Sequence, residues 1–184
     1  MATDVTTLLN AHRNGDASAL NQLADLLYPE LKAMARNRSR SGAGLGATTL
    51  VNETFLKLLS GGELRTDDRR QFFALMATIM RQIIVDEIRY VTADKRARRD
   101  VTFVDTVMGD DAHEKAELLL QVDEALNVVA AQDEQLAVVF ECRYFAGMTT
   151  AETAEALSVS PRTAERLWAE ARARVGELID DRTE

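Results

Sequence analysis

Hydrophobic residues recur along much of this chain at spacings of three and four positions, the period of an amphipathic α-helix. In the first half, the pattern predicts a short helix over residues 5–12. A second helix, which Asp16 can cap, ends in the basic stretch RNRSRSGAGLGA. Two further helices are expected over residues 48–59 and 69–98. The apolar positions of the helix after Asp16 are Leu20, Leu23, Leu27, Leu31 and Met34.

The periodicity stops at residues 100–114, DVTFVDTVMGDDAHE. This stretch is mixed and acidic and has no helical pattern, which predicts a linker. Helical patterns then resume and continue almost to the end of the chain. The helices expected in this second half cover residues 118–130, 134–145, 150–157 and 161–179.

These patterns predict an all-α protein with two small helical domains, residues 1–99 and 117–184, joined by a flexible acidic linker over residues 100–116. The composition agrees, because the 184 residues include only 9 Gly and 2 Pro, whereas the helix formers Ala, Leu, Glu and Arg are abundant. Hydrophobic residues make up 46% and charged residues 28%, as in a folded domain rather than a disordered one.

Several functional classes are excluded by what the sequence lacks. No apolar run approaches the ~18 residues of a membrane span, and no secretory signal is visible, so we expect a cytoplasmic protein without a membrane partner. A single cysteine, Cys142, and two histidines, His12 and His113, nearly exclude a metal cluster. No nucleophile motif is present, and GAGLGA lacks the preceding strand of a dinucleotide site. We therefore expect no enzymatic activity, no metal and no cofactor.

The charge is distributed unevenly along the chain, whose net charge is −8. Residues 1–100 carry 15 Lys and Arg against 12 Asp and Glu, whereas residues 101–184 carry 7 against 18. A basic patch attracts phosphates even in an acidic chain, although each cation cluster taken alone could equally be a solvated helix face. The clustered cations are Arg36, Arg38, Arg40, Arg89, Lys95, Arg96, Arg98 and Arg99.

The sharpest local motif is MTTAETAEALSVSPRTAERLWAEARARV. Thr149 and Glu152 form a Thr-x-x-Glu capping box, and Ser160 followed by Pro161 is typical of an N-cap with proline at the first helical position. The tight turn between the two helices contains Ser158, where such turns usually have glycine. The motif predicts a helix-turn-helix, whose second helix enters the DNA major groove.

Four polar residues lie in the first two turns of that second helix, where base edges would be reached. Arginine can bind guanine through two hydrogen bonds and glutamate can accept one from cytosine, whereas threonine is less selective. Arg172 and Arg174 lie further along and suit phosphates better. The alternative is a plain helical hairpin with an Arg/Glu ladder on its surface. The four candidates for base contacts are Arg162, Thr163, Glu165 and Arg166.

Taken together, these segments resemble bacterial extracytoplasmic-function (ECF) sigma factors, the minimal two-domain type of the sigma family. LVNETFLKLL resembles the family's polymerase-docking helix, and QFFALMATIMRQIIVDEIRYVTADKRARR resembles its promoter-melting helix. The motif above resembles its C-terminal helix-turn-helix. The resemblance implies a sigma factor that binds core RNA polymerase and promoter DNA, with the first domain recognising the −10 element and the second the −35 element.

The resemblance also implies roles for individual residues. The docking helix, residues 48–59, would bind a basic coiled coil of the largest polymerase subunits, and the loop over residues 60–70 would hold a flipped base of the non-template strand. Phe72 and Phe73 are either core residues or stacking surfaces for bases. The implied polymerase-binding residues are Thr48, Thr49, Asn52, Glu53 and Lys57. The implied DNA-binding residues of the next helix are Arg81, Asp86, Arg89 and Tyr90.

One departure from the family concerns Thr48 and Thr49, which stand where the family usually carries acidic residues. A helix without that charge should bind a basic polymerase surface poorly, and a phosphothreonine would restore about −1.5 to −2 charges. Similar threonine-bearing members form a subgroup linked to Ser/Thr protein kinases, which implies a kinase partner. Thr48 is slightly favoured as the modified residue because it occupies the position of the family's glutamate, and Thr54 lies farther into the helix. Simple helix capping by either threonine is the alternative.

A stand-alone helix-turn-helix regulator that binds duplex DNA as a dimer is the competing interpretation of the whole chain. The docking-helix segment favours the sigma factor, because a stand-alone regulator needs no such helix. Co-purification with core RNA polymerase would separate the two interpretations.

Overall fold

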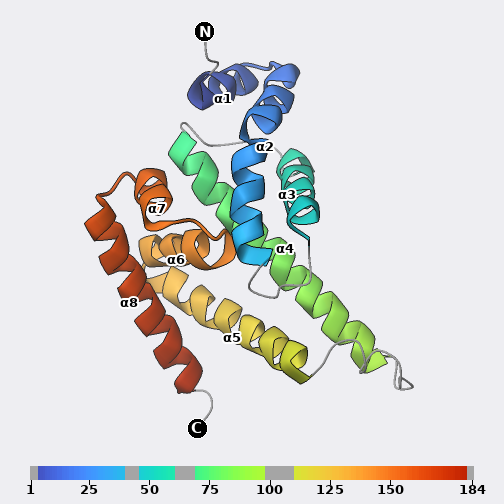
Figure 1. Ribbon diagram of the computed structural model, residues 1–184, viewed down its shortest axis with the longest axis vertical. Coiled ribbons are helices and arrows are strands. Elements are labelled where there is room, and N and C mark those ends of the chain that lie inside the picture. The colour runs from blue at the N-terminus through green and yellow to red at the C-terminus, as the bar shows by residue number, and fades with distance from the viewer. Residues whose placement is uncertain (1–3, 40–45, 61–68, 98–109, 182–184) are drawn as a thin grey trace.

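The computed structural model describes residues 4–39, 46–60, 69–97 and 110–181. Within these ranges every regular element is a helix, which confirms the predicted all-α class. Figure 1 shows the first half, coloured blue to green, beside the second half, coloured yellow to red. The long green helix lies between the other helices of the first half and the helices of the second half.

The helices of the first half begin and end close to the positions that the pattern predicts. Helix α4 ends one residue before the predicted boundary, whereas α2 extends into the basic stretch as far as Ser39. The four helices are α1 (Val5–Arg13), α2 (Ala17–Ser39), α3 (Ala47–Ser60) and α4 (Arg69–Ala97).

The start of α2 has the cap that the sequence predicts. The Oδ1 atom of Asp16 accepts hydrogen bonds from the backbone nitrogen of Ser18 at 2.9 Å and from its hydroxyl at 2.7 Å. The hydroxyl bond is the largest influence that holds the pKa of the Asp16 carboxyl below its ordinary value of 3.8. Because of this cap, α2 begins directly after the turn that follows α1.

The second half differs from the prediction at two places. Helix α5 begins at Asp110, eight residues before the predicted start, so the end of the predicted linker is helical. The apolar pattern did not predict these helical residues, because alanine is the only apolar residue type in residues 110–117. The remaining part of the predicted linker, residues 100–109, lies outside the described residues. The elements are α5 (Asp110–Gln132), α6 (Glu134–Phe140), η1 (Glu141–Phe145), α7 (Thr150–Leu157) and α8 (Pro161–Asp180).

The second difference is η1, a five-residue π-helical turn that continues α6. The backbone nitrogen of Ala146 donates to the carbonyl of Glu141 at 3.0 Å, a bond that spans five residues instead of four. The sequence predicted one uninterrupted helix here, because a π-helical turn has no apolar period of its own. Such turns are rare and occur frequently at functional sites.

The core of the first half is built from the apolar positions that the pattern identifies. Leu23, Leu27 and Leu31 of α2 are fully buried, and so is Phe72 of α4. Phe73 is 7% exposed, and its ring packs edge-to-face on Phe72 with centroids 6.0 Å apart. Both phenylalanines are therefore core residues in this conformation and do not present a stacking surface for bases.

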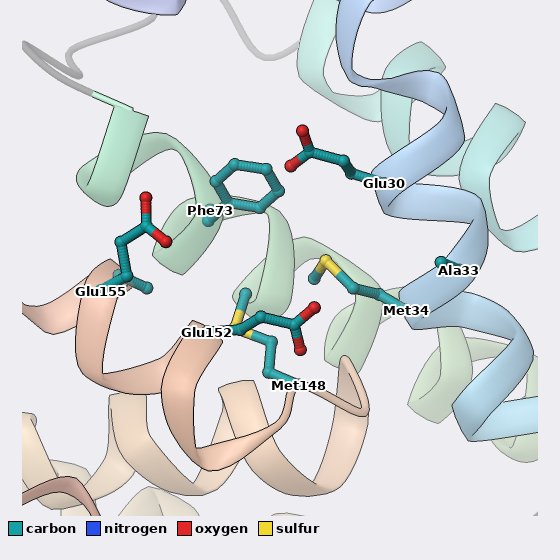
Figure 2. Close-up of a pocket in the computed structure, with 8 residues that line it drawn as sticks. Glu30, Ala33, Met34, Phe73, Met148, Glu152 and Glu155 are labelled. Atoms are coloured by element: carbon teal, nitrogen blue, oxygen red, sulfur yellow. The ribbon is translucent and has the colours of Figure 1, made fainter. Parts of the chain in front are cut away.

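The two halves pack directly against one another, because α4 contacts α5, η1 and α7. A cavity of about 260 Å³ lies at this junction. Figure 2 shows Met34 of α2, Phe73 of α4 and Met148, which precedes α7, directed toward it. The carboxylates of Glu30, Glu152 and Glu155 surround these apolar groups.

Candidate functional site

Helix α3 presents one face to the core and the other to solvent. Leu50 and Val51 are 3% and 0% exposed, and Phe55 and Leu58 continue this buried face at helical spacing. The opposite face carries polar side chains, as the resemblance implied. The residues exposed on the N-terminal half of α3 are Thr48, Thr49, Asn52 and Glu53.

A groove of about 810 Å³ runs between α3 and α4. The Nζ atom of Lys57 lies 3.2 Å from Oδ2 of Asp86 in this groove, and both side chains remain accessible to solvent. Leu56 is 57% exposed and lies in this groove. The lining residues are Thr49, Glu53, Leu56, Lys57, Ser60, Ile83, Asp86, Glu87 and Tyr90.

The groove is acidic and also has apolar lining residues. Three of its lining side chains, Glu53, Asp86 and Glu87, are carboxylates and only Lys57 is a cation. Such a surface suits a basic partner that also offers an apolar contact for Leu56. Sequence reasoning did not identify Leu56, Ile83 and Glu87 as site residues. Each lies three or four positions from an identified residue, so helical spacing would have indicated them.

The three threonines of α3 lie in different surroundings. Thr48 and Thr49 are exposed in the first turn, whose side chains include no acidic residue. Thr54 is completely buried, and its Oγ1 donates to the carbonyl of Leu50 at 2.6 Å. Only the first two hydroxyls are accessible to a second protein in the folded chain.

The candidate residues of α4 are divided between two sides. Asp86 and Tyr90 are exposed beside the groove, and Tyr90 is 70% exposed. Arg81 and Arg89 instead contact the second half of the chain. The resemblance implied that all four residues lie along one DNA-facing side of α4. In this conformation, two of them lie beside the groove and the other two face the second half of the chain.

Arg81 is enclosed where α4 meets α5 and η1, with only 8% of its surface exposed. Its Nε atom donates to Oδ1 of Asp123 at 2.8 Å and its Nη1 atom to Oε1 of Glu141 at 2.9 Å. Its Nη2 atom donates to the carbonyl of Asp123 at 2.9 Å and to Oδ1 of Asn127 at 2.6 Å. The other carboxylate oxygen of Glu141 accepts from the hydroxyl of Thr78. These residues form a cluster that we call the Arg81 network: Thr78, Arg81, Asp123, Asn127 and Glu141.

Helices α7 and α8 follow the predicted capping chemistry. Thr149 accepts from the backbone nitrogen of Glu152 at 3.3 Å, and Glu152 accepts from that of Thr149 at 2.7 Å, which completes the capping box. Ser160 accepts from the backbone nitrogen of Thr163 at 3.1 Å and Pro161 is the first residue of α8. Ser158 ends α7 with φ 58° and ψ 36°, the left-handed conformation that glycine adopts more easily.

The first two turns of α8 carry the four candidates for base contacts. Arg162 is exposed, and Thr163 bonds the hydroxyl of Ser160 at 2.8 Å. Glu165 accepts from the hydroxyl of Thr150 at 2.9 Å, which ties α8 to the start of α7. Arg166 lies 3.3 Å from Glu170, and its side chain is 66% exposed.

Two arginines flank the single tryptophan of the chain. The guanidinium of Arg172 lies 5.2 Å from the ring centroid of Trp168, and that of Arg143 lies 5.5 Å from it. Both distances are typical of cation–π contacts. Arg143 also donates to the carbonyl of Met148 at 3.0 Å. The ring thereby holds Arg172, the predicted phosphate contact, against the helix.

A family model described as ECF sigma factor matches residues 2–181. The chain belongs to the ECF sigma factor family. Its members are transcription initiation factors that act with core RNA polymerase at promoter DNA and are not themselves enzymes. A search of curated proteins found no match. The family match favours the sigma factor over the stand-alone regulator.

Part of the predicted surface of this ECF sigma factor falls outside the described residues. Residues 61–68 of the base-capture loop predicted over residues 60–70 lie there, as do Arg40, Arg98 and Arg99. Within the described ranges, no group of His, Cys, Asp and Glu is arranged to hold a metal ion. None of the helices there is both long and apolar enough to cross a membrane.

The Arg81 network is a structural feature of this ECF sigma factor that sequence reasoning did not find. The resemblance named Arg81, but its partners Asp123 and Glu141 lie 42 and 60 residues away along the chain. No local pattern marks either carboxylate as buried. The only signal was their position on the apolar sides of predicted helices, where a charge must find a partner.

Proposed function

We propose that this ECF sigma factor docks on core RNA polymerase through the α3–α4 groove and reads promoter DNA through α4 and the first turns of α8. The observation that carries the docking assignment is the acidic groove, which Leu56 lines with 57% of its surface exposed. An exposed arginine at position 162, next to the capped start of α8, supports the second contact. A helix N-terminus presented in this way suits base contacts in the major groove.

We further infer that phosphorylation of Thr48 or Thr49 strengthens docking. Both hydroxyls are exposed in the first turn of α3, and that turn contains no carboxylate. A phosphate there meets the positive end of the helix dipole, so the fold tolerates it. It also extends the negative charge of the groove, which strengthens contacts to arginine on a basic partner.

The geometry favours Thr49 over Thr48, which the resemblance to the family slightly favoured. Thr49 lines the groove together with Glu53, one helical turn away, whereas Thr48 does not line it. A phosphate on Thr49 would therefore lie beside the existing carboxylate. Thr54 is not accessible, because its buried hydroxyl already donates to a backbone carbonyl.

Site-specific incorporation of phosphothreonine tests this proposal and does not require that the kinase be identified. We would prepare the protein with phosphothreonine at position 48 or at position 49 and measure its affinity for core RNA polymerase and its promoter run-off transcription. The expected result is tight binding and transcription for the protein modified at position 49, and weak binding for the unmodified protein. Phosphothreonine at Thr7, exposed on α1, is the matched control and should behave like the unmodified protein.

The outcomes separate the two levels of the proposal. Equal core binding by modified and unmodified protein would overturn the phosphorylation step and leave the docking assignment in place. Transcription activated through position 48 alone would move the site to the neighbouring residue. If none of the forms binds core RNA polymerase, the docking assignment itself is wrong.

A further inference from the structure

Arg172 and Arg174 are close together in the sequence of α8 but have different surroundings. Residues two positions apart in an α-helix are rotated by about 200° around its axis, so the two side chains leave α8 on nearly opposite sides. The Nη2 atom of Arg174 lies 3.1 Å from Oε1 of Glu170, and Nη1 of Arg166 lies 3.3 Å from Oε2 of the same carboxylate. The guanidinium group of Arg172 instead lies 5.2 Å from the ring centroid of Trp168.

This difference decides which of the two arginines is ready to bind a phosphate. A carboxylate occupies N–H donors of an arginine and cancels part of its charge, so a phosphate must compete with it. An aromatic ring attracts the cation but brings no opposite charge, so the charge of the guanidinium group remains available. Arg172 is exposed, and no carboxylate of the described residues pairs with it. Its donors are therefore available to a phosphate, whereas those of Arg174 are already engaged.

The ring of Trp168 is held in place by the helices that pack against α8. The ring of Phe140, at the end of α6, lies 5.4 Å from it, and Phe140 is only 3% exposed. The guanidinium group of Arg143 in η1 lies 5.5 Å from the same ring and donates to the carbonyl of Met148 at 3.0 Å. Because the ring is fixed, it restricts the side chain of Arg172 before any ligand binds, which lowers the entropy lost on binding.

The position of Arg172 along α8 fits the edge of a DNA interface. Arg172 lies seven residues after Glu165, which places the two side chains along one line of the helix, about 10 Å apart. Glu165 belongs to the first two turns, which carry the candidates for base contacts. A recognition helix that enters the major groove by its N-terminal residues meets the DNA backbone further along. Arg172 is therefore placed where α8 would pass a backbone phosphate.

We propose that Trp168 is a positioning residue for promoter recognition, which holds the guanidinium group of Arg172 as the contact for one backbone phosphate of the −35 element. The inference rests on the proposed function, because it takes α8 to be the helix that enters the major groove. Trp168 acts through Arg172 and does not itself contact DNA. The phosphate contact is assigned to Arg172 and not to Arg174, two residues that the sequence pattern did not distinguish.

The two arginines provide matched variants that test the phosphate contact. We would saturate the full-length protein with core RNA polymerase and measure its affinity for promoter DNA over a range of salt concentrations. Arg172→Gln is expected to weaken binding about tenfold, as for the loss of one charged hydrogen-bond contact. It should also reduce the slope of log affinity against log salt concentration by about one. Arg174→Gln removes the same charge from the same helix and should leave the slope unchanged.

Variants of Trp168 test the positioning role. Trp168→Leu is expected to weaken promoter binding about threefold, the effect of losing an exposed cation–π contact, whereas Trp168→Phe retains an aromatic face and most of the affinity. In the Arg172→Gln background, Trp168→Leu should have no further effect, because the ring acts through Arg172. Leu178→Ala, partly buried ten residues further along α8, controls for loss of packing and should leave promoter affinity unchanged. Equal losses from Trp168→Leu in both backgrounds would overturn the positioning role.

The fluorescence of Trp168, the only tryptophan of the chain, gives a second measurement if Trp168→Leu unfolds. In the free full-length protein, we expect the emission to change in Arg172→Gln and to stay unchanged in Arg174→Gln. An unchanged emission or an unchanged salt slope in Arg172→Gln overturns the inference and leaves the proposed function in place. Absence of promoter binding by the saturated wild type instead contradicts the proposed function.

Discussion

The ammonium group of Lys57 on α3 and the carboxylate of Asp86 on α4 lie 3.2 Å apart across the proposed docking groove. Their side chains are 39% and 64% exposed, so the pair contributes little to stability. Because solvent reaches both side chains, each can form an ion pair with another charged group when a second protein surface approaches. The groove therefore combines the exposed apolar side chain of Leu56 with a charged pair that can change partners.

The first prediction concerns Leu56. Leu56→Ala should weaken binding to core RNA polymerase by about tenfold, because the proposed interface would remove from water a large apolar side chain that the free protein exposes. The free energy of unfolding should change little, since Leu56 is 57% exposed in the free protein. Leu26→Ala on α2, 44% exposed and outside the groove, is the control. Equal effects of the two changes on polymerase affinity would remove Leu56 from the interface.

The second prediction concerns base recognition by α8. Arg162→Ala should cost about 1–3 kcal/mol of promoter binding and relax the preference at one base pair, as expected for a lost bidentate contact. Arg166→Ala should have the smaller effect, because Arg166 is already paired with Glu170 at 3.3 Å. Binding to a set of single-base-pair promoter variants measures both. A loss that is equal on all sequences, as expected for the phosphate contact Arg172→Ala, would assign Arg162 to the DNA backbone.

The boundaries of α7 and α8 could be predicted from sequence because their signals are local. Thr149, Glu152, Ser160 and Pro161 act on backbone groups within three residues of themselves, so the pattern of residue types fixes the helix ends. The early start of α5 at Asp110 carried no such signal in its apolar residues. Local chemistry thus predicts elements well where caps are present and poorly where they are absent.

The packing of the two halves could not be predicted, because it depends on residues far apart in the chain. An arginine among apolar neighbours, such as Arg81 beside Met80 and Ile84, has the same sequence pattern whether it faces solvent or a buried carboxylate. Its burial follows from Asp123 and Glu141, which become its neighbours only after folding. The sequence therefore predicted the accessible side of α3, whereas the surroundings of Arg81 and Arg89 on α4 could not be predicted from it.

The third prediction concerns the N-cap of α8. Ser160→Ala should lower the free energy of unfolding by about 1 kcal/mol, because the backbone nitrogen of Thr163 loses its acceptor. Ser160→Asp should retain most of the stability, since aspartate caps equally well. Urea unfolding followed by circular dichroism measures both variants. An alanine variant as stable as the wild type would show that Ser160 does not act as a cap in solution.

The last prediction concerns the pH dependence of stability through Cys142. Burial, followed by the charge of neighbouring Glu141, raises the pKa of the Cys142 thiol from 9.0 to about 12. In the unfolded chain the thiol ionises near its ordinary pKa, whereas in the folded protein it keeps its proton until about pH 12. The unfolded state therefore binds fewer protons between these values, and stability falls as the pH rises.

This contribution to stability is fully present below pH 9 and is lost toward pH 12. The expected slope is about 1.4 kcal/mol of unfolding free energy per pH unit between these limits. Urea unfolding of the wild type and of Cys142→Ala at a series of alkaline pH values isolates it, since all other titrating groups are common to both proteins. The alanine variant should be less stable below pH 9 because of its cavity, and its stability should fall less steeply above it. Parallel curves for the two proteins would show that the thiol of Cys142 ionises as readily in the folded protein as in the unfolded chain.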